Sequence, residues 1–443
     1  MKLVSTRDAS RSVSLREGVL AGLAPDGGLY LPERWPQLSP AELESLRGRS
    51  FLEVARTVAL RLFEETLPRD RIETIVEAAL DLDIPLIELS PDTYVLELFH
   101  GPTGSFKDTG ARFLSRLLPA LEPSSDRPVL VVVATSGDTG GAVTHAFRNV
   151  EGARAVVLFP KGRVSAVQYE QIVSGGVGDA GVRAVSVEGS FDDCQRLVKE
   201  SLADGELARK AALTSANSIN IGRLLPQIFH FVHAWAQLDR PPRSFHVSVP
   251  TGNVGHLVSG VMAQRMGLPV TGLMAATNAN DGLVRYIMEG ETPSGPSRQT
   301  LSNAMDVAIP SNLERLIALF DGDRSKLGAL VSAASYTDED TLRAIEEVHR
   351  SSGYLIDPHT AVGWLGLQEL RRSGAETGGP KVVLATAHPA KFPDVVEQAT
   401  GVWPSRPEAW DPFEAGGAGS DAVARISPRM SALRPILDGV IGE

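Results

Sequence analysis

The sequence predicts an α/β protein built on parallel sheets with helices on both faces. Three observations lead to this prediction. Short β-branched and apolar runs alternate with helical patterns from about residue 94 onward. The run "RPVLVVVA" (127–134) is apolar over its last six positions, which is typical of a strand buried on both faces. Several such strands end in glycine-rich loops that lead into helices, and ligands of parallel sheets bind at these strand ends.

The pattern along the chain divides it into four regions. Residues 1–90 carry apolar residues at helical spacing and are expected to form a mainly helical N-terminal region. Residues 91–235 and 236–400 each repeat the strand–loop–helix unit, which predicts two α/β domains. The second of these domains contains a less regular insert near 278–330, and residues 401–443 are expected to form a loop-like tail.

Composition excludes several classes of function. The formal net charge is −11 with both signs interspersed, so the sequence offers no basic surface for nucleic acid or for anionic membranes. Cys194 is the single cysteine, which excludes a disulfide or a cysteine-based zinc site within one chain. The "HFVH" segment (230–233) has no evident third ligand, so we expect core packing and no metal. The chain starts without an apolar leader and is expected to be cytoplasmic, as a monomer or a homodimer.

Lys107 is the first candidate for chemistry. It lies between the strand "YVLELF" (94–99), the glycine-containing turn that follows it, and the helix that begins near Lys107. The strand and Phe106 make the setting apolar, and an apolar setting lowers the pKa of a lysine because it disfavours the ammonium. A neutral amine can bond an aldehyde, so Lys107 is a candidate anchor for pyridoxal phosphate. A surface lysine at a helix start is the alternative.

Two glycine-rich loops have the pattern of anion sites. The loop "PTGNVGH" (250–256) follows a strand and opens a helix, so its backbone N–H groups can converge on a phosphate. The loop "ATSGDTGGA" (134–142) offers Ser136, Thr139 and helix-start amides to a carboxylate. Asp138 is unexpected in an anion site, but it could accept a hydrogen bond from the ring hydroxyl of the cofactor. Ordinary tight turns and an N-capping residue are the alternatives.

A third polar loop, "TSANSINIGR" (214–223), places hydroxyl, amide and guanidinium groups just before a helix. This combination is suited to a phosphate or a carboxylate. A polar loop with one surface arginine is the alternative.

Taken in order, these motifs resemble the threonine synthase family, in its long bacterial and fungal form. That family belongs to the fold type II pyridoxal-phosphate enzymes, whose fold resembles the tryptophan synthase β chain. The resemblance covers roughly residues 3–400 and rests on the segments "GLAPDGGLYLP", "LELFHGPTGSFKD", "ATSGDTGGAV", "SANSINIGRLL", "VPTGNVG", "LSNAMDVAIPSN" and "ATAHPAKFP".

The resemblance implies a role for each matching position. Lys107 would be the catalytic residue that bonds the cofactor aldehyde, with Asp138 beside the ring oxygen and Thr386 at the pyridine nitrogen. The cofactor phosphate would be held by Thr251, Gly252, Asn253, Val254, Gly255 and His256. The substrate carboxylate would be held by Ser136, Gly137 and Thr139, and the substrate phosphate by Asn217, Ser218 and Arg223.

The resemblance also implies the reaction, in which O-phospho-L-homoserine and water give L-threonine and phosphate. Another reaction of the same cofactor is an alternative, such as a serine or threonine dehydratase or a cysteine-synthase-like replacement. A non-catalytic relative that binds a phosphate ligand is a second alternative. The chain departs from the family pattern at Gly104, Ser105, Val254 and His256, and these changes bear on packing around the site.

Overall fold

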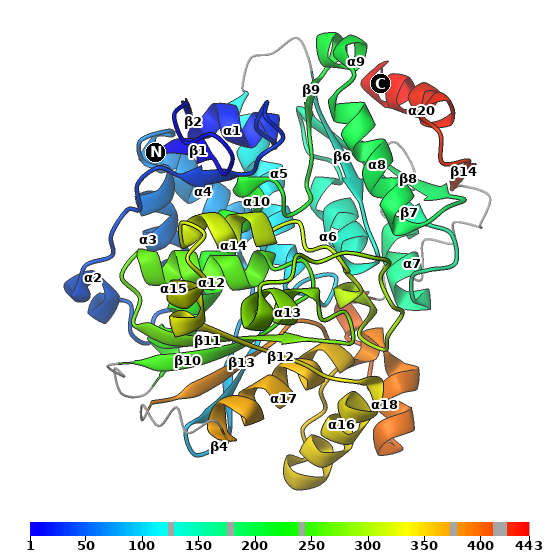
Figure 1. Cartoon of the computed structure of the whole chain (residues 1–443). Helices are drawn as coiled ribbons and strands as arrows, with labels where there is room; N and C mark the ends of the chain where they lie inside the picture. The colour runs from blue at the N-terminus through cyan, green and yellow to red at the C-terminus, as the bar shows by residue number, and fades with distance from the viewer. Residues whose placement is uncertain (123–127, 175–180, 239–243, 373–378, 411–422, 443) are drawn as a thin grey trace.

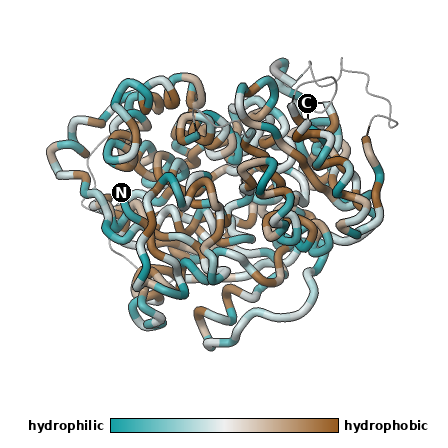
Figure 2. Tube along the Cα trace, turned by 90° about the horizontal axis from the view of Figure 1, so that it is seen from above, coloured by the Kyte–Doolittle hydropathy of each residue, from teal (hydrophilic) through white to brown (hydrophobic). Residues whose placement is uncertain are grey.

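Two central β-sheets, surrounded by helices, organise the molecule (Figure 1). The computed structural model describes residues 1–122, 128–174, 181–238, 244–372, 379–410 and 423–442. One sheet has five strands and the other has six, and a small antiparallel sheet lies near the N-terminus. The two ends of the described chain lie on opposite sides of the molecule (Figures 1 and 2). The α/β class with parallel sheets is therefore confirmed.

The five-stranded sheet is parallel throughout and has the order β14-β8-β7-β6-β9. Its strands are β14 (Ala424–Ile426), β8 (Val182–Val187), β7 (Ala153–Pro160), β6 (Val129–Ala134) and β9 (Ala212–Thr214). Alternate residues of β6 face opposite layers, because side chains alternate along a strand. Val131 belongs to the core cluster that includes Phe147, whereas Val132 packs with Leu197 and Leu433. The apolar run thus reflects burial on both faces.

Helices cover both faces of this sheet. The face with Val131 is covered by α5 (Lys107–Leu121) and α6 (Asp138–Phe147). The face with Val132 is covered by α8 (Phe191–Leu202) and α20 (Met430–Gly442), which lie side by side (Figure 1). Residues 424–442 lie in the region expected to be loop-like, yet they form β14 and α20 because their apolar side chains complete this face.

The six-stranded sheet has the order β12-β11-β10-β13-β5-β4, and only the β4–β5 pairing is antiparallel. Its strands are β12 (Val331–Ser335), β11 (Val270–Thr277), β10 (Phe245–Pro250), β13 (Lys381–Ala385), β5 (Thr93–Glu97) and β4 (Leu86–Ser90). Among the helices that flank it are α12 (Gly255–Arg265) and α17 (Pro358–Arg372). Because β5 pairs with β13, the segment before Lys107 joins a sheet made mainly of residues beyond 244.

The N-terminal region packs against the rest through one large core cluster. It comprises β1 (Lys2–Ser5), β2 (Ser12–Ser14), α1 (Leu15–Ala21), β3 (Tyr30–Pro32), α2 (Pro40–Ser45), α3 (Phe51–Phe63) and α4 (Arg69–Ala79). The remaining elements are α7 (Ala166–Ser174), α9 (Gly205–Lys210), α10 (Ile221–Leu224), η1 (Leu225–Gln227), α11 (Ile228–Gln237), α13 (Gly282–Glu289), η2 (Asn303–Met305), α14 (Leu313–Leu319), α15 (Arg324–Leu330), α16 (Asp338–Ser352), η3 (Pro389–Lys391), α18 (Pro393–Thr400) and η4 (Glu408–Trp410). Within the described ranges, no helix has both the length and the apolar character needed to cross a membrane.

Candidate active site

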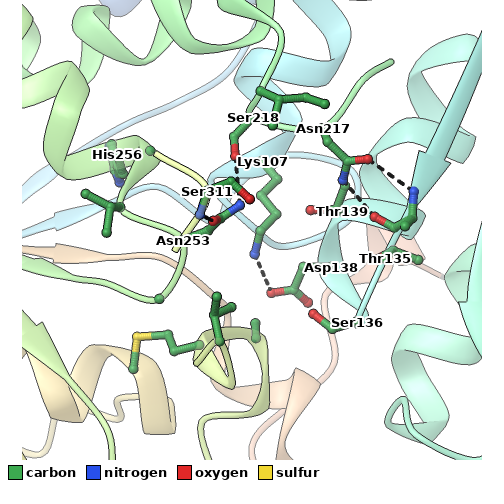
Figure 3. Close-up of a pocket in the computed structure, with 18 of the residues that line it drawn as sticks. Lys107, Thr135, Ser136, Asp138, Thr139, Asn217, Ser218, Asn253, His256 and Ser311 are labelled. Atoms are coloured by element: carbon green, nitrogen blue, oxygen red, sulfur yellow. Dashed lines mark hydrogen bonds and ion pairs between the residues drawn. The ribbon is translucent and has the colours of Figure 1, made fainter. Parts of the chain in front are cut away.

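The loops at the carboxyl ends of the parallel strands converge on one pocket. The loops after β5, β6, β9, β10 and β13 all contribute to its lining. All of the residues predicted for the site line this pocket except Gly137, which lies directly behind it in the loop after β6. In Figure 3, Lys107 lies between Asn253 and Ser218 on one side and Ser136 and Asp138 on the other. The pocket therefore lies at the strand ends, as the sheet topology requires.

Lys107 is the first residue of α5 and points into the pocket (Figure 3). Its side chain is 17% exposed, and its Nζ lies 3.2 Å from Oδ2 of Asp138. This carboxylate oxygen is the one hydrogen-bond acceptor that Nζ has among the described residues, and the Phe106 ring centroid lies 5.0 Å away. Burial lowers the pKa of Lys107, with Asp138 opposing that effect. The surroundings thus favour the neutral amine that attacks an aldehyde.

Asp138 is the first residue of α6 and is 2% exposed. Its Oδ1 accepts a hydrogen bond from Nε2 of Gln168 at 2.9 Å and lies 3.0 Å from Nζ of Lys391. Burial alone would raise the pKa of Asp138, but the charges of Lys391 and Lys107 hold it well below its usual range. Asp138 is therefore an ionised carboxylate inside the pocket.

The loop after β10 forms a cradle of backbone donors. Among the described residues, no acceptor pairs with the backbone N–H groups of Gly252, Asn253, Val254 and Gly255. These groups lie at the N-terminus of the 11-residue helix α12, where the helix dipole favours an anion. A Cβ atom on Gly252 would lie 2.6 Å from Cα of Met305, so the close approach of these two segments requires glycine. The donors fit a phosphate group.

Side chains fix the shape of this cradle. Oδ1 of Asn253 accepts the backbone N–H of Ser311 at 2.6 Å, and its Nδ2 donates to Oγ of Ser218 at 3.1 Å (Figure 3). The hydroxyl of Thr251 donates to the carbonyl of Val249 at 2.7 Å. Val254 has a φ of 64°, a left-handed conformation that is strained for a β-branched residue. The cradle is thus built on a strained turn held by neighbouring loops.

His256 closes the cradle on the side of Phe106. Its Nε2 lies 3.1 Å from Nδ1 of His230, whereas its buried Nδ1 has no partner among the described residues. Burial lowers the pKa of His256 well below its ordinary value, so the ring is neutral. An unpartnered ring nitrogen beside a phosphate cradle fits a group that would bind there. His230 and His233 both lie in the core, as the sequence predicts.

The loop after β6 forms a second group of free donors. The backbone N–H groups of Ser136, Asp138 and Thr139 have no partner among the described residues. Oγ1 of Thr135 accepts the N–H groups of Gly137 at 2.9 Å and of Gly140 at 2.8 Å, which fixes the loop. Gly137 has a φ of 148°, and a Cβ atom there would lie 2.4 Å from the amide group of Gln168. Gly137 shapes this loop, which can hold a carboxylate, without lining the pocket itself.

The loop after β9 contributes a third group of hydrogen-bond donors to the pocket. Arg223 is 3% exposed, its Nη1 donates to the carbonyl of Ala216, and its Nε has no partner among the described residues. Burial lowers the pKa of Arg223 to about 10, so the guanidinium is charged at neutral pH. No carboxylate within the described ranges forms a salt bridge with Arg223. It is therefore a buried cation that can pair with an anion in the pocket.

Asn217 and Ser218 are already engaged by the protein. The amide of Asn217 pairs with both backbone groups of Ala134, with Nδ2 donating at 2.7 Å and Oδ1 accepting at 3.1 Å. Ser218 Oγ accepts hydrogen bonds from Asn253 at 3.1 Å and from Asn312 at 2.9 Å, and its own proton remains to be donated. Asn217 thus joins the loop after β9 to the end of β6. Ser218 joins the same loop to the loop after β10.

Thr386 follows β13 and faces the pocket at 6% exposure. Its carbonyl accepts the backbone N–H of Phe106 at 3.0 Å, so it also holds the turn before Lys107. The hydroxyl is the group that could meet a ring nitrogen.

Sequence reasoning missed several residues of the pocket. Met305 and His359 line it, and Gln168 and Lys391 lie behind Asp138. Lys391 belongs to the motif "ATAHPAKFP", in which only Thr386 is predicted as a site residue. Lys391 lies between Ala390 and Phe392, shortly after a predicted core strand. A charged residue in this apolar setting is the sequence feature that could have indicated it.

Three sequence models of known families match the chain. The family described as "Pyridoxal-phosphate dependent enzyme" matches residues 83–387, "Threonine synthase N terminus" matches 2–80, and "Threonine synthase, C-terminal" matches 360–415.

Individual proteins match over nearly the whole chain. The threonine synthase of Haemophilus influenzae is 39% identical over 93% of this chain and 94% of its own length. The threonine synthase of Escherichia coli K12 is 38% identical over 90% of this chain and 91% of its own. The crystal structure of PLP-bound threonine synthase from Brucella melitensis has a TM-score of 0.89 and 37% identity, covering 100% of this chain and 99% of that one.

Proposed function

The chain belongs to the threonine synthase family of pyridoxal-phosphate-dependent lyases, and from this premise we propose that its pocket converts O-phospho-L-homoserine and water to L-threonine and phosphate. In this proposal the substrate phosphate leaves from the γ carbon and the water oxygen adds at the β carbon. The pocket therefore has to hold three anionic groups, namely the phosphate of the cofactor and the carboxylate and phosphate of the substrate.

One observation carries the proposal: three separate groups of unpaired donors surround Lys107. They are the N–H groups of residues 252–255, the N–H groups of Ser136, Asp138 and Thr139, and the Nε of Arg223, which has no partner among the described residues. We assign the first to the cofactor phosphate, the second to the substrate carboxylate and the third, together with Asn217 and Ser218, to the substrate phosphate. A dehydratase acting on serine or threonine needs only the first two groups.

The cofactor, when bound, supplies the electron sink that stabilises negative charge on the α carbon of the substrate. Lys107 is the residue proposed to bond the cofactor aldehyde and then to move protons at the α and β carbons. Burial lowers the pKa of its Nζ, which has one hydrogen-bond acceptor among the described residues. Thr386 would face the ring nitrogen with a hydroxyl, and Asp138 would lie near the ring oxygen.

The site also has to exclude bulk water while admitting one water as reactant. The buried side chains of Val254 and Met305 and the half-buried ring of Phe106 border the pocket, and these apolar surfaces disfavour stray solvent. Arg223 would orient the substrate from its phosphate end, so that the α and β carbons face the amine of Lys107.

Two measurements test this proposal: the site of borohydride labelling and the products of the reaction. Borohydride reduction of the protein with its cofactor, followed by peptide mass mapping, should label Lys107. O-phospho-L-homoserine should give threonine and inorganic phosphate in equal amounts without 2-oxobutyrate. Accumulation of 2-oxobutyrate would instead favour a dehydratase, and failure to consume the substrate would favour a phosphate-binding relative.

A further inference from the structure

Lys391 is a second lysine at the site, and it is more deeply buried than Lys107. Its side chain is 0% exposed and lies in η3, just after β13. Its Nζ contacts the carbonyl of Thr103 at 2.8 Å, Oε1 of Gln171 at 2.9 Å and Oδ1 of Asp138 at 3.0 Å. The two oxygens of Asp138 therefore face two different lysines, with Lys107 on Oδ2.

The hydrogen-bond partners distinguish these two lysines. An ammonium has three N–H donors and no acceptor. Nζ of Lys391 donates hydrogen bonds to two oxygens and forms an ion pair with a third oxygen, on Asp138. Nζ of Lys107 has one acceptor among the described residues, at the longer distance of 3.2 Å. Because a buried ammonium needs its donors satisfied, the arrangement places the positive charge on Lys391.

The pairing explains why an aspartate can stand at position 138. The carboxylate of Asp138 and the ammonium of Lys391 together carry no net charge. Without Lys391, the negative charge of Asp138 would act on Lys107 alone and would stabilise its ammonium form.

We propose that Lys391 is a positioning residue that orients Asp138 and compensates its charge, so that Lys107 keeps an uncharged amine for the cofactor. This rests on the proposed role of Lys107 as the anchor. When the neutral amine of Lys107 bonds the aldehyde carbon, the carbon–oxygen double bond would break, and the aldehyde oxygen would leave as water with the two protons of the amine. An ammonium has no electron pair with which to begin this step.

Several other charged or titratable groups lie near Lys107. Burial raises the pKa of Asp108, the next residue, whose carboxyl oxygens accept hydrogen bonds from Thr103 at 2.9 and 2.6 Å, and Lys199 lines the pocket. Arg223 is a cation and further disfavours a second positive charge. His256 is neutral because burial holds its pKa well below the ordinary value. His359, on α17, contributes to the low pKa of Asp138, but its Nδ1 lies 2.6 Å from Asp357 and its Nε2 accepts the N–H of Ala304 at 3.1 Å.

The test measures the pH at which Lys107 becomes reactive in the full-length protein after removal of the cofactor. Brief labelling with isotopic acetic anhydride at a series of pH values, followed by peptide mass mapping, gives the midpoint. Lys391→Met should raise the midpoint by about one pH unit, which is about tenfold less neutral amine near pH 7. Capture of added pyridoxal phosphate should slow by the same factor.

Three further variants isolate the charge effect. Asp138→Asn should lower the labelling midpoint of Lys107 or leave it low, because no carboxylate at position 138 then offsets the effect of the Lys391 cation on Lys107. The double variant Lys391→Met/Asp138→Asn removes both charges and should return the midpoint close to that of the wild type. Lys381→Met, in β13, is the matched control. Within the described ranges the one polar contact of Nζ of Lys381 is the carbonyl of Gly379 at 3.4 Å, so this variant should leave the midpoint of Lys107 unchanged.

The outcomes are decisive. An unchanged midpoint in folded Lys391→Met overturns the proposal, and so does a double variant that fails to return towards the wild type. Near-ultraviolet circular dichroism shows whether Lys391→Met folds. If it does not fold, the labelling midpoint of Lys107 in the wild-type protein tests the proposal instead, because a midpoint near the ordinary pKa of 10.5 contradicts it. A borohydride label on another lysine would refute the anchor assignment instead, while the acetylation midpoints would still report on Lys391.

Discussion

The ring of His256 lies flat against the ring of Phe106, with centroids 4.6 Å apart and planes 8° from parallel. Phe106 immediately precedes Lys107, and His256 is the second residue of α12, so the stack joins the proposed anchor lysine to the loop proposed to hold the cofactor phosphate. The contact continues through His230, whose Nε2 lies 2.9 Å from Oγ1 of Thr109 on α5. The helices α5, α11 and α12 are thereby joined by one buried hydrogen-bonded chain.

His256→Ala should weaken cofactor binding without unfolding the protein. The variant loses the stack on Phe106 and the unpartnered Nδ1, and an aromatic stack contributes about 0.5–1.5 kcal/mol beyond burial. We expect the dissociation constant of pyridoxal phosphate to rise about tenfold, measured by equilibrium titration of the visible absorbance. His349→Ala, on α16 far from the pocket, is the control. Unchanged affinity in His256→Ala would show that the cradle does not need this ring.

The protein should lose stability on mild acidification. Burial lowers the pKa of His230 to about 3 and that of His233 to about 4, whereas both would titrate near 6.5 in the unfolded chain. The unfolded state then binds more protons below about pH 6.5, so the free energy of unfolding falls as the pH drops, by about 1.4 kcal/mol per unit per histidine. Urea unfolding at about pH 7, 6 and 5 tests this, and His233→Gln should reduce the slope. A free energy that stays level across this range would contradict the neutral state of these rings.

Gly252→Ala should disrupt the cradle. The added Cβ atom would lie 2.6 Å from Cα of Met305, a backbone atom that cannot move aside alone. We expect loss of measurable cofactor binding at concentrations that saturate the wild type. Gly328→Ala is the matched control, because Gly328 lies in α15 with nothing within 4 Å of an added Cβ atom. That substitution should stabilise the protein by up to about 1 kcal/mol. Normal cofactor binding in Gly252→Ala would contradict the tight packing of this turn.

Arg223→Gln should impair the use of the phosphorylated substrate selectively. The guanidinium is buried without a carboxylate partner among the described residues, and a charge-assisted contact of this kind contributes about 1.5–3 kcal/mol. We expect kcat/KM for O-phospho-L-homoserine to fall about 100-fold while the affinity for pyridoxal phosphate is unchanged. L-Homoserine, which lacks the phosphate, should perturb the cofactor spectrum equally in both proteins. An equal loss for both ligands would place Arg223 elsewhere in the site.

The sequence predicted the features that depend on pattern and strand order. The run at 127–134 predicts a buried strand because its last six positions are apolar. The loop at 250–256 predicts an anion site because it joins a strand to a helix. The comparisons with known proteins confirm the fold class and the family. The four regions and the individual site roles remain proposals.

Other features depend on contacts between distant segments, which pattern reasoning does not provide. Lys391 meets Asp138 across 253 positions of sequence, because η3 and α6 follow strands of different sheets. The engagement of Asn217 by Ala134 likewise depends on the pairing of β9 with β6. The sequence pattern did not predict helix α20, because its apolar residues complete a face of the sheet whose strands, apart from β14, lie more than 200 positions earlier.

Arg315 should be essential for the stability of the pocket although it does not line it. It is 0% exposed, and its guanidinium donates to the carbonyls of Tyr30 at 2.9 Å, Ser218 at 2.7 Å and Ile219 at 2.5 Å. Burial lowers its pKa to about 9, so it remains charged at neutral pH. The planar fork thus ties the N-terminal region to the loop that carries Ser218, a geometry that a lysine cannot reproduce.

Arg315→Lys should therefore lower the free energy of unfolding by about 2–3 kcal/mol, because buried carbonyls lose charged donors. The KM for O-phospho-L-homoserine should rise as the loop of Ser218 relaxes. Urea unfolding and steady-state kinetics on the same preparation check both effects. Arg343→Lys is the matched control, because Arg343 lies on the exposed side of α16 and pairs with Glu339 at 2.9 Å. If Arg315→Lys and Arg343→Lys unfold at the same urea concentration, the three carbonyls do not need the guanidinium, and the N-terminal region is held to the pocket by apolar packing alone.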